Sequence, residues 1–177
     1  MALPYCIATL IYAFNDRDDV LLIQRQNQPN QGLWSPFGGK LDTQSGESPH
    51  ACAARETREE LGIAVGSGAF HLTGMISEEA NQGTTHWLMF LFELQPRLKT
   101  LPPAIDEGRF QFFAREQLLD LPIPQTDREQ IWPLFWTHRG GFFVAHCQGA
   151  REGDRWTLEE SYPKLTPAHS SERPEAP

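Results

Sequence analysis

Residues 55–62 read Arg-Glu-Thr-Arg-Glu-Glu-Leu-Gly, and this stretch decides the fold. On a helix with 3.6 residues per turn, Glu56, Glu59 and Glu60 share one face because three and four positions separate them. Like charges at these spacings destabilise an isolated helix by about 0.2–0.5 kcal/mol per pair. Mg²⁺ binds in proteins through a few carboxylates together with substrate phosphates. The face therefore indicates a metal site for phosphate chemistry, and a solvated helix surface is the alternative.

The residues around this stretch favour the metal site. Ser48 and Pro49 are typical of a helix start, and Gly62 is typical of a helix end. Gly38 and Gly39 come before the helix, so the segment forms a loop–helix–loop unit. We expect a helix over residues 48–61 whose opposite face packs on a sheet through Ala51, Ala54, Thr57 and Leu61.

The rest of the chain predicts strands on both sides of this helix. Apolar, β-prone segments indicate strands at 5–14, 20–24, 69–77, 84–94, 109–113 and 142–147. We expect the first two to form a hairpin and residues 84–94 to lie centrally. Helices are expected at residues 115–119 and 128–137, with Pro133 in the first turn of the second helix or kinking it. Residues 1–160 are expected to form one domain, and residues 161–177 a tail rich in Pro and Ser.

Composition limits the classes of function. The 177 residues carry a formal net charge of −8, which argues against non-specific binding to nucleic acid. Cys6, Cys52 and Cys147 are widely spaced, as expected for free thiols in a reducing cytosol. The sequence has neither a long apolar run nor a signal peptide, so we expect a cytoplasmic protein with no membrane partner. Aromatic residues near the C-terminus indicate a homodimer.

The segment Gly39…Glu47…Arg55-Glu56-Thr57-Arg58-Glu59-Glu60-Leu61-Gly62-Ile63 resembles the signature of the Nudix hydrolases, G-x5-E-x7-R-E-U-x-E-E-x-G-U, where U is a bulky aliphatic residue. The seven-residue gap between Glu47 and Arg55 matches the signature. Seven residues rather than five separate Gly39 from Glu47, and Thr57 occupies the first U position. The extra residues fall in a loop, where insertions are tolerated, and they leave the placement of Glu47 open.

The resemblance implies an α/β fold, namely a Nudix-type α/β/α sandwich with a mixed β-sheet. It implies hydrolysis of a pyrophosphate bond in a nucleoside diphosphate derivative, with Mg²⁺ or Mn²⁺ as the cofactor. The metal ligands would be the Gly38 carbonyl and the side chains of Glu47, Glu56, Glu59 and Glu60. Arg55 has no proton to give near neutral pH, so its better role is to hold a carboxylate. The base would be Glu56 or Glu107, with Asp106 as the alternative to Glu107.

The substrate is less sharply defined. The order of segments, including Trp34-Ser35-Pro36-Phe37, resembles the MutT-type enzymes that hydrolyse oxidised purine nucleoside triphosphates to monophosphate and pyrophosphate. Ser35 stands where these enzymes have a purine-reading Asn, and residues 123–127 have no Trp-Pro-Asp-Asp motif. The resemblance implies substrate contacts at Arg25, Trp34, Lys40 and Trp87. ADP-ribose or another nucleotide sugar is the alternative substrate. A non-catalytic nucleotide-binding regulator is the alternative class of protein, although the complete set of glutamates favours an enzyme.

Overall fold

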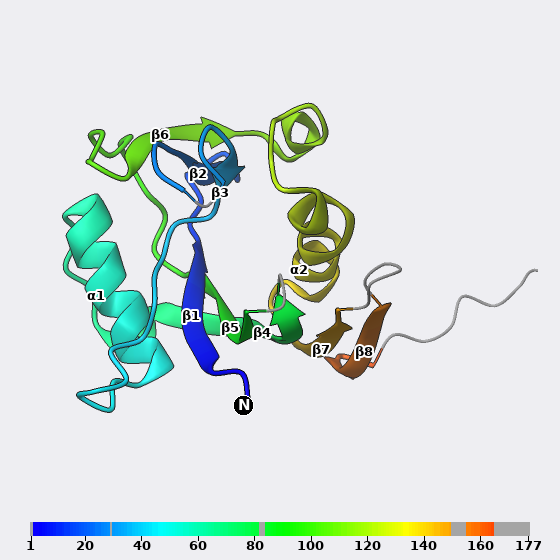
Figure 1. The fold of residues 1–177 in the computed structure, drawn as a ribbon. Coiled ribbons are helices and arrows are strands. Elements are labelled where there is room, and N and C mark those ends of the chain that lie inside the picture. Colours follow the sequence, from blue (N-terminus) through cyan, green and yellow to red (C-terminus); the bar gives the residue numbers. More distant parts are fainter. Residues whose placement is uncertain (1, 29, 82–83, 150–154, 165–177) are drawn as a thin grey trace, which may run out of the picture.

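The structure, a computed structural model, describes residues 2–28, 30–81, 84–149 and 155–164. Figure 1 shows helix α1 (Pro49–Leu61) and helix α2 (Trp132–His138) on opposite sides of a layer of strands. This arrangement confirms the predicted α/β/α sandwich. In the described part of the chain, no helix is long and apolar enough to cross a membrane.

The larger sheet is mixed, as predicted. Its strands are β1 (Tyr5–Tyr12), β5 (Thr85–Leu94), β4 (Phe70–Asn81), β7 (Phe142–Gln148) and β8 (Arg155–Tyr162), in that spatial order. The pairs β1–β5 and β4–β7 are parallel, whereas β4–β5 and β7–β8 are antiparallel. Strand β5 has a neighbour on each side, which agrees with the central position expected from its nearly continuous apolar sequence.

The smaller sheet corrects one expectation. It contains β2 (Val20–Arg25), β3 (Trp34–Ser35) and β6 (Gly108–Phe113) in the order β3-β2-β6, all antiparallel. The predicted hairpin between the first two strands is wrong, because β1 pairs along its whole length with β5. The two segments meet at their ends, through an antiparallel bridge between Phe14 and Val20 and a hydrogen bond from the Leu21 N–H to the Ala13 carbonyl at 2.8 Å. The polar turn that follows Phe14 therefore sends the chain into a second sheet.

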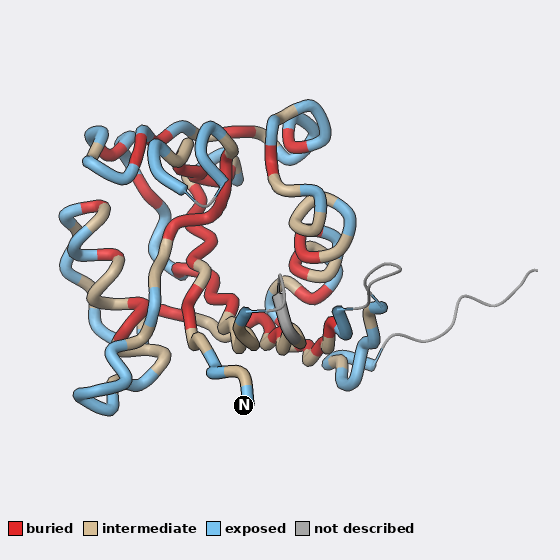
Figure 2. The backbone as a smooth tube through the Cα atoms, viewed as in Figure 1, coloured by how far each residue is buried: buried red, intermediate tan, exposed pale blue. Residues whose placement is uncertain are grey.

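The end of strand β1 and the two residues after it are buried on both faces, and their side chains divide the interior into two clusters. Tyr12 and Phe14 face α2, where the ring of Phe135 stacks on that of Tyr12 with centroids 3.8 Å apart. Ile11 and Ala13 belong to the cluster that includes Ala53 of α1. Figure 2 shows this buried run passing through the centre of the molecule. The double burial explains why the sequence of this strand is apolar rather than alternating.

Several shorter elements complete the fold. The predicted helix at 128–137 begins with a π-helical turn, η3 (Asp127–Ile131), before α2. Pro133, the second residue of α2, has no N–H to donate and its ring crowds the preceding turn, which accounts for the wider turn there. Two 3₁₀ turns, η1 (Ser67–Ala69) and η2 (Arg115–Leu119), lie at the surface.

The boundary between the domain and the tail differs slightly from the expectation. Ser161 and Tyr162, which the composition assigns to the tail, pair with Phe143 and Phe142 and complete β8. Paired backbone in an edge strand is part of the folded sheet, so the sheet extends past residue 160. The rest of the expected tail from residue 165 lies outside the described residues.

Candidate active site

Helix α1 has the ends that the sequence predicts. The Ser48 hydroxyl accepts a hydrogen bond from the Ala51 N–H at 3.2 Å, and Gly62 ends the helix in the left-handed conformation with φ 70°. Its buried residues are Cys52, Ala53, Thr57 and Leu61, which confirms Thr57 and Leu61 of the predicted packing face, whereas Ala51 and Ala54 are only half-buried. Thr57 is fully buried, and its hydroxyl donates to the Ala53 carbonyl at 2.7 Å. A polar residue is therefore tolerated at a position where the Nudix signature has an aliphatic one.

Arg55 gathers three of the glutamates. Its Nε and Nη2 donate to the two carboxylate oxygens of Glu47 at 2.9 and 3.0 Å. Its Nη1 donates to Glu56 Oε1 at 2.6 Å and to Glu59 Oε2 at 3.0 Å. The hydrogen bond from Arg55 holds the pKa of the Glu47 carboxyl below its usual range, and Glu47 in turn raises the pKa of Arg55. One guanidinium thus fixes carboxylates from both the loop and the helix.

The longer loop before Glu47 closes on itself. The Glu47 N–H donates to the Asp42 carbonyl at 3.1 Å, and the Asp42 N–H donates to Glu47 Oε2 at 2.9 Å. Asp42 Oδ1 also accepts from the Gln44 N–H at 3.0 Å, which makes an Asx turn. The two extra residues are absorbed within this turn, and the Glu47 carboxylate reaches Arg55.

Gly38 presents its backbone to the site. The carbonyls of its neighbours Phe37 and Gly39 both accept hydrogen bonds from β1, at 2.8 Å each. The Gly38 N–H instead donates to Glu60 Oε1 at 3.0 Å, and no described residue donates to the Gly38 carbonyl. Gly38 has φ 131°, and a Cβ there would collide with the Thr9 carbonyl. Only glycine is compatible with this backbone, which leaves a carbonyl oxygen free beside Glu60.

Gly39 lies directly against the Glu56 carboxylate. A Cβ at Gly39 would overlap the carboxylate carbon and both of its oxygens. Because Gly39 has no side chain, the Glu56 carboxylate can lie between Arg55 and the loop.

Burial and mutual repulsion act on the two most enclosed glutamates. Burial raises the pKa of Glu60 to about 7, and repulsion from Glu56 and Glu107 adds to the increase. The Gly38 N–H and, more weakly, Arg25 oppose this increase in the pKa of Glu60. Burial likewise raises the pKa of Glu56, against the effect of Arg55. The site therefore concentrates negative charge that the protein neutralises only in part.

The donor set fits a hard divalent cation by its chemistry. Carboxylate oxygens and one free carbonyl are the ligands that Mg²⁺ prefers. Among the residues that the structure describes, no three acidic, His or Cys side chains converge closely enough to hold a metal ion. In this structure Arg55 contacts both Glu56 and Glu59, at 2.6 and 3.0 Å. The side chain of Glu59 is 51% exposed.

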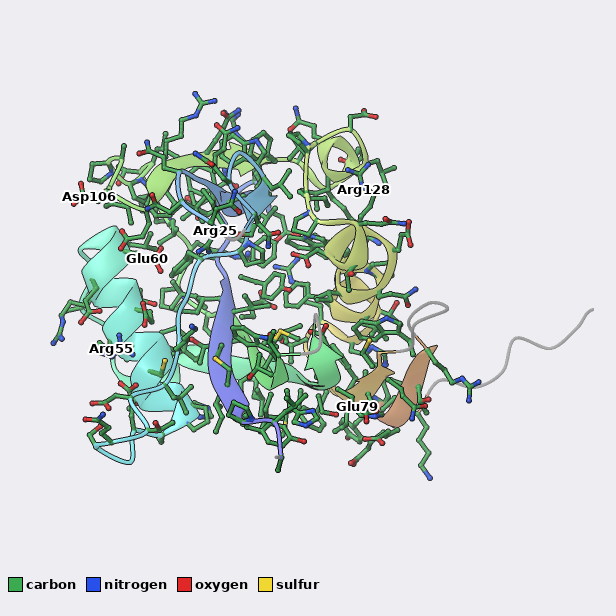
Figure 3. The ribbon with its side chains drawn as sticks, in the orientation of Figure 1. Arg25, Arg55, Glu60, Glu79, Asp106 and Arg128 are labelled. Carbon is green, nitrogen blue, oxygen red and sulfur yellow. The ribbon has the colours of Figure 1, made fainter. Side chains whose placement is uncertain are left out.

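Glu107, Arg25 and Glu60 lie close enough to influence one another, although they come from different elements. The carboxylate of Glu107 and the guanidinium of Arg25 both act on the pKa of Glu60, with opposite signs. Figure 3 shows Glu60 near the end of α1 that faces the smaller sheet, with Arg25 and Asp106 on that side. The predicted loop acid Glu107 therefore lies within electrostatic range of Glu60.

Two of the predicted substrate contacts meet on the other face of β1. The loop at 37–41 runs along the free edge of β1, where Ala8 bridges to Lys40. The Lys40 ammonium lies 5.7 Å from the centroid of the Trp87 ring, and Trp87 is only half-buried. Its indole is thus partly exposed beside this loop.

Trp34 has a different environment. Its side chain belongs to the core cluster, is only 4% exposed, and meets Phe113 edge to face at a centroid distance of 4.8 Å. This placement does not support direct contact with a substrate. The aromatic ring fills the space under the smaller sheet. From the sequence alone, a tryptophan that packs in the core cannot be distinguished from one that binds a ligand.

Two acids that the sequence interpretation did not select lie near Trp87. Glu78 is directly opposite Trp87 in the β4–β5 pair, so both side chains point to the same face. Burial raises the pKa of Asp127 to about 7, and repulsion from Glu78 adds to the increase. Within the described residues no donor binds the Asp127 carboxylate. The sequence alone predicts Asp127 to be a helix cap. Only the structure shows that its carboxylate is buried over the sheet.

Comparisons with known proteins agree with this geometry. The family model described as the NUDIX domain matches residues 4–132. The uncharacterized Nudix hydrolase YvcI of Bacillus subtilis (strain 168) is 31% identical over 114 residues, which cover 62% of this chain and 67% of that protein.

Solved structures share the fold. The MutT protein from Bacillus halodurans superimposes with a TM-score of 0.68 at 23% identity, covering 90% of this chain and 99% of that chain. The NUDIX domain of Shewanella oneidensis NrtR, solved in complex with ADP ribose, has a TM-score of 0.60 at 16% identity, covering 77% of this chain and 88% of that chain.

The fold and the glutamate-rich helix define a pyrophosphohydrolase of nucleotide derivatives, a class whose members generally use divalent metals. The chain belongs to the Nudix family.

Proposed function

We propose that this Nudix hydrolase splits a nucleoside triphosphate, with an oxidised purine nucleotide as one candidate, into a monophosphate and pyrophosphate. The observation that carries the proposal is the gathering of Glu47, Glu56 and Glu59 on Arg55, next to Glu60. Hydrolysis of a phosphate anhydride needs charge neutralisation and positioning more than covalent chemistry by the protein. A cluster of enclosed carboxylates meets this need once a cation is bound.

The residues that would hold Mg²⁺ or Mn²⁺ are Glu56, Glu59, Glu60 and the Gly38 carbonyl. A bound metal would neutralise the phosphate oxygens and polarise the attacked phosphorus. Glu47 and Arg55 would orient the carboxylates from behind, the kind of support that typically changes metal affinity by about 10- to 100-fold. The attacking water would lose its proton to Glu56 or Glu107. Of these, Glu107 is the more exposed, whereas Glu56 is bound by Arg55.

The nucleoside would lie on the Trp87 side of the loop. Lys40 follows Gly38 and Gly39 directly, so one short segment joins the carboxylates to the Trp87 ring. The indole face suits stacking with a base. The unpaired carboxylate of Asp127, close to the same face, suits an N–H group of that base.

The test is a substrate panel with the metal as a variable. Purified protein is incubated with canonical and oxidised nucleoside triphosphates, ADP-ribose, dinucleoside polyphosphates and NADH, with Mg²⁺, Mn²⁺ or a chelator. We expect metal-dependent release of pyrophosphate from a triphosphate, reduced at least about 100-fold in Glu59→Gln and Glu60→Gln. Turnover within a few-fold of wild type in both variants would show that the helix is not the metal platform.

A second candidate, hydrolysis of ADP-ribose, is favoured by the solved NrtR domain, which binds that molecule. The panel separates the two, because ADP-ribose yields AMP and ribose phosphate instead of pyrophosphate. No turnover of any compound would favour a nucleotide-binding regulator. The homodimer, the cytoplasmic location and the absence of a nucleic-acid partner stay predictions from composition.

A further inference from the structure

A groove of about 420 Å³ lies between η2 and helix α2, and it shares no residue with the proposed active site. Trp132 and Trp136, one turn apart on α2, stack with their ring centroids 5.7 Å apart. Trp136 is half-buried and Leu119 is 69% exposed. The apolar part of the lining consists of Leu118, Leu119, Ile123, Trp132, Pro133 and Trp136. An exposed apolar surface of this kind is typical of a binding groove.

Two arginines also line this groove, and neither forms an ion pair with a carboxylate in the described part of the chain. Arg128 donates through Nη1 and Nη2 to two backbone carbonyls, at 2.7 and 2.6 Å, which fixes its charge at the groove. Arg115 is exposed and lies over the Trp136 ring, 4.8 Å from its centroid. Glu116 is the acid of the lining. The lining thus carries an excess of positive charge on a chain whose net charge is −8, and it favours an acidic occupant.

The end of β8 brings the C-terminal segment of the chain close to this groove. The Tyr162 carbonyl and Pro163 lie against Gly141 and leave no room for a Cβ there. The Gly141 N–H donates to the His138 carbonyl at 2.7 Å, so this contact directly follows the last turn of α2. Thr137, which precedes His138, lines the groove. Figure 1 shows α2 and β8 on the same side of the molecule, opposite α1. The segment after residue 164 therefore begins beside one end of the groove.

Residues 165–177 have the length that the groove requires. Thirteen extended residues span at most about 45 Å. The groove follows η3 and α2, whose five and seven residues rise by at most about 18 Å along a helix axis. The segment is therefore long enough to run from the end of α2 to Arg128.

The composition of this segment matches the groove as well. Pro174 and Pro177 have the Pro-x-x-Pro spacing of segments that bind aromatic grooves as a polyproline II helix, at a low cost in conformational entropy. Glu172 and Glu175 lie on either side of Pro174, and together with Arg173 they give the segment a net negative charge. The prolines thus suit the tryptophans, and the glutamates suit the arginines.

We propose that residues 165–177 dock in this groove of their own chain, with the prolines against Trp136 and the glutamates near Arg115 and Arg128. The docked segment covers the exposed apolar surface of η2 and α2 and provides the acidic partners that the two arginines lack. The inference is independent of the proposed function, because the groove and the glutamate site have no residue in common.

A spin label at position 176 of the full chain tests the docking by nuclear magnetic resonance. Ala176→Cys provides the attachment point in a Cys6→Ser background, since Cys52 and Cys147 are buried. The label should abolish the indole N–H signal of Trp136 when the segment is docked, and reduction of the label should restore that signal.

Variants on both sides of the contact make the test specific. Arg115→Glu reverses a charge in the groove and should return the Trp136 signal in the labelled chain. Glu172→Lys combined with Pro174→Ser changes the segment alone and should do the same, so the test does not depend on the folding of the Arg115→Glu variant. Arg17→Glu, the same charge reversal in an exposed turn, is the matched control and should leave the signal abolished.

Two outcomes overturn the proposal. The first is a Trp136 signal that is the same in the labelled parent chain and in the variant with Glu172→Lys and Pro174→Ser. The second comes from a mixture of spin-labelled chains with isotope-enriched chains that carry no label. Loss of the Trp136 signal in this mixture would show that the segment binds the groove of a second copy instead of its own.

Discussion

Arg55 donates to both carboxylate oxygens of Glu47, at 2.9 and 3.0 Å, across a loop that is two residues longer than the Nudix signature allows. The same guanidinium also contacts Glu56 and Glu59. A single cation thus connects the loop to the helix and orients the acids of both. This pairing explains how the site tolerates the insertion, because the geometry of Glu47 depends on Arg55 and not on the length of the loop.

Replacing Arg55 by Lys should disrupt this arrangement although it keeps the positive charge. Lysine is a point charge and lacks the planar fork that contacts three carboxylates at once. We expect kcat/KM to fall about 100-fold and Mg²⁺ affinity about 10- to 100-fold. Steady-state kinetics at varied Mg²⁺ checks both. Arg58→Lys, an exposed change on the same helix, serves as the control. Activity near wild type in Arg55→Lys would contradict the positioning role.

Gly39→Ala should impair activity with little effect on folding. The added Cβ would overlap the Glu56 carboxylate, which ends a flexible side chain and can move away. A displacement of about 1 Å in a catalytic group can cost about 100-fold in rate. The measurement is turnover together with the melting temperature. Gly66→Ala, where a Cβ meets open space, should leave both unchanged.

Glu107→Gln distinguishes the two candidate bases. If Glu107 takes the proton from the attacking water, kcat should fall about 100- to 10,000-fold, and the acidic limb of the pH–rate profile should disappear. A variant that retains the wild-type profile would leave Glu56 as the base. Glu116→Gln, the same change at an exposed glutamate outside the proposed site, is the control.

Asp127→Asn should stabilise the protein at neutral and alkaline pH. Burial raises the pKa of Asp127 from its usual value of 3.8 to about 7, so between these values the folded state keeps a proton that the unfolded state has lost. The free energy of unfolding therefore decreases as pH rises through this window and is constant above it. At about 1.4 kcal/mol per pH unit, the total reaches up to about 4 kcal/mol.

Denaturant unfolding at pH 4 and pH 8 measures this difference. The wild type should lose stability between the two values relative to Asp127→Asn, and the variant should gain most at pH 8. Asp120→Asn, at an exposed position near the same helix, is the control. An equal effect of Asp127→Asn at both pH values would mean that the carboxyl keeps an ordinary pKa in the folded state.

Trp34 and Trp87 should respond differently to truncation. Trp34→Ala removes a core ring and should cost about 3–5 kcal/mol of unfolding free energy. Trp87→Ala removes a half-buried ring, so we expect a smaller loss of stability and a higher KM for the substrate. Urea unfolding and steady-state kinetics separate the two effects. A higher KM in Trp34→Phe with unchanged stability would restore Trp34 as a substrate contact.

Much of the fold was predictable because it depends on local patterns. The helix at residues 49–61 follows from Ser48, Pro49 and Gly62, and the β5 strand from its apolar run. The failed β1–β2 hairpin has a non-local cause, since β1 pairs with β5, more than seventy residues away. Strand pairing over such a distance leaves no mark in either strand that identifies its partner.

The stretch from Arg55 to Gly62 by itself determined the family, the helix and the shared face of Glu56, Glu59 and Glu60, because helical spacing is a property of the local chain. Tertiary structure alone decided which carboxylates meet which cations. Arg55 reaches Glu47 through a closed loop, Glu60 meets Gly38, and Arg25 and Arg109 line one cavity. Such contacts depend on how two sheets and a helix are placed in space, and electrostatic interactions act through distance rather than through position in the sequence.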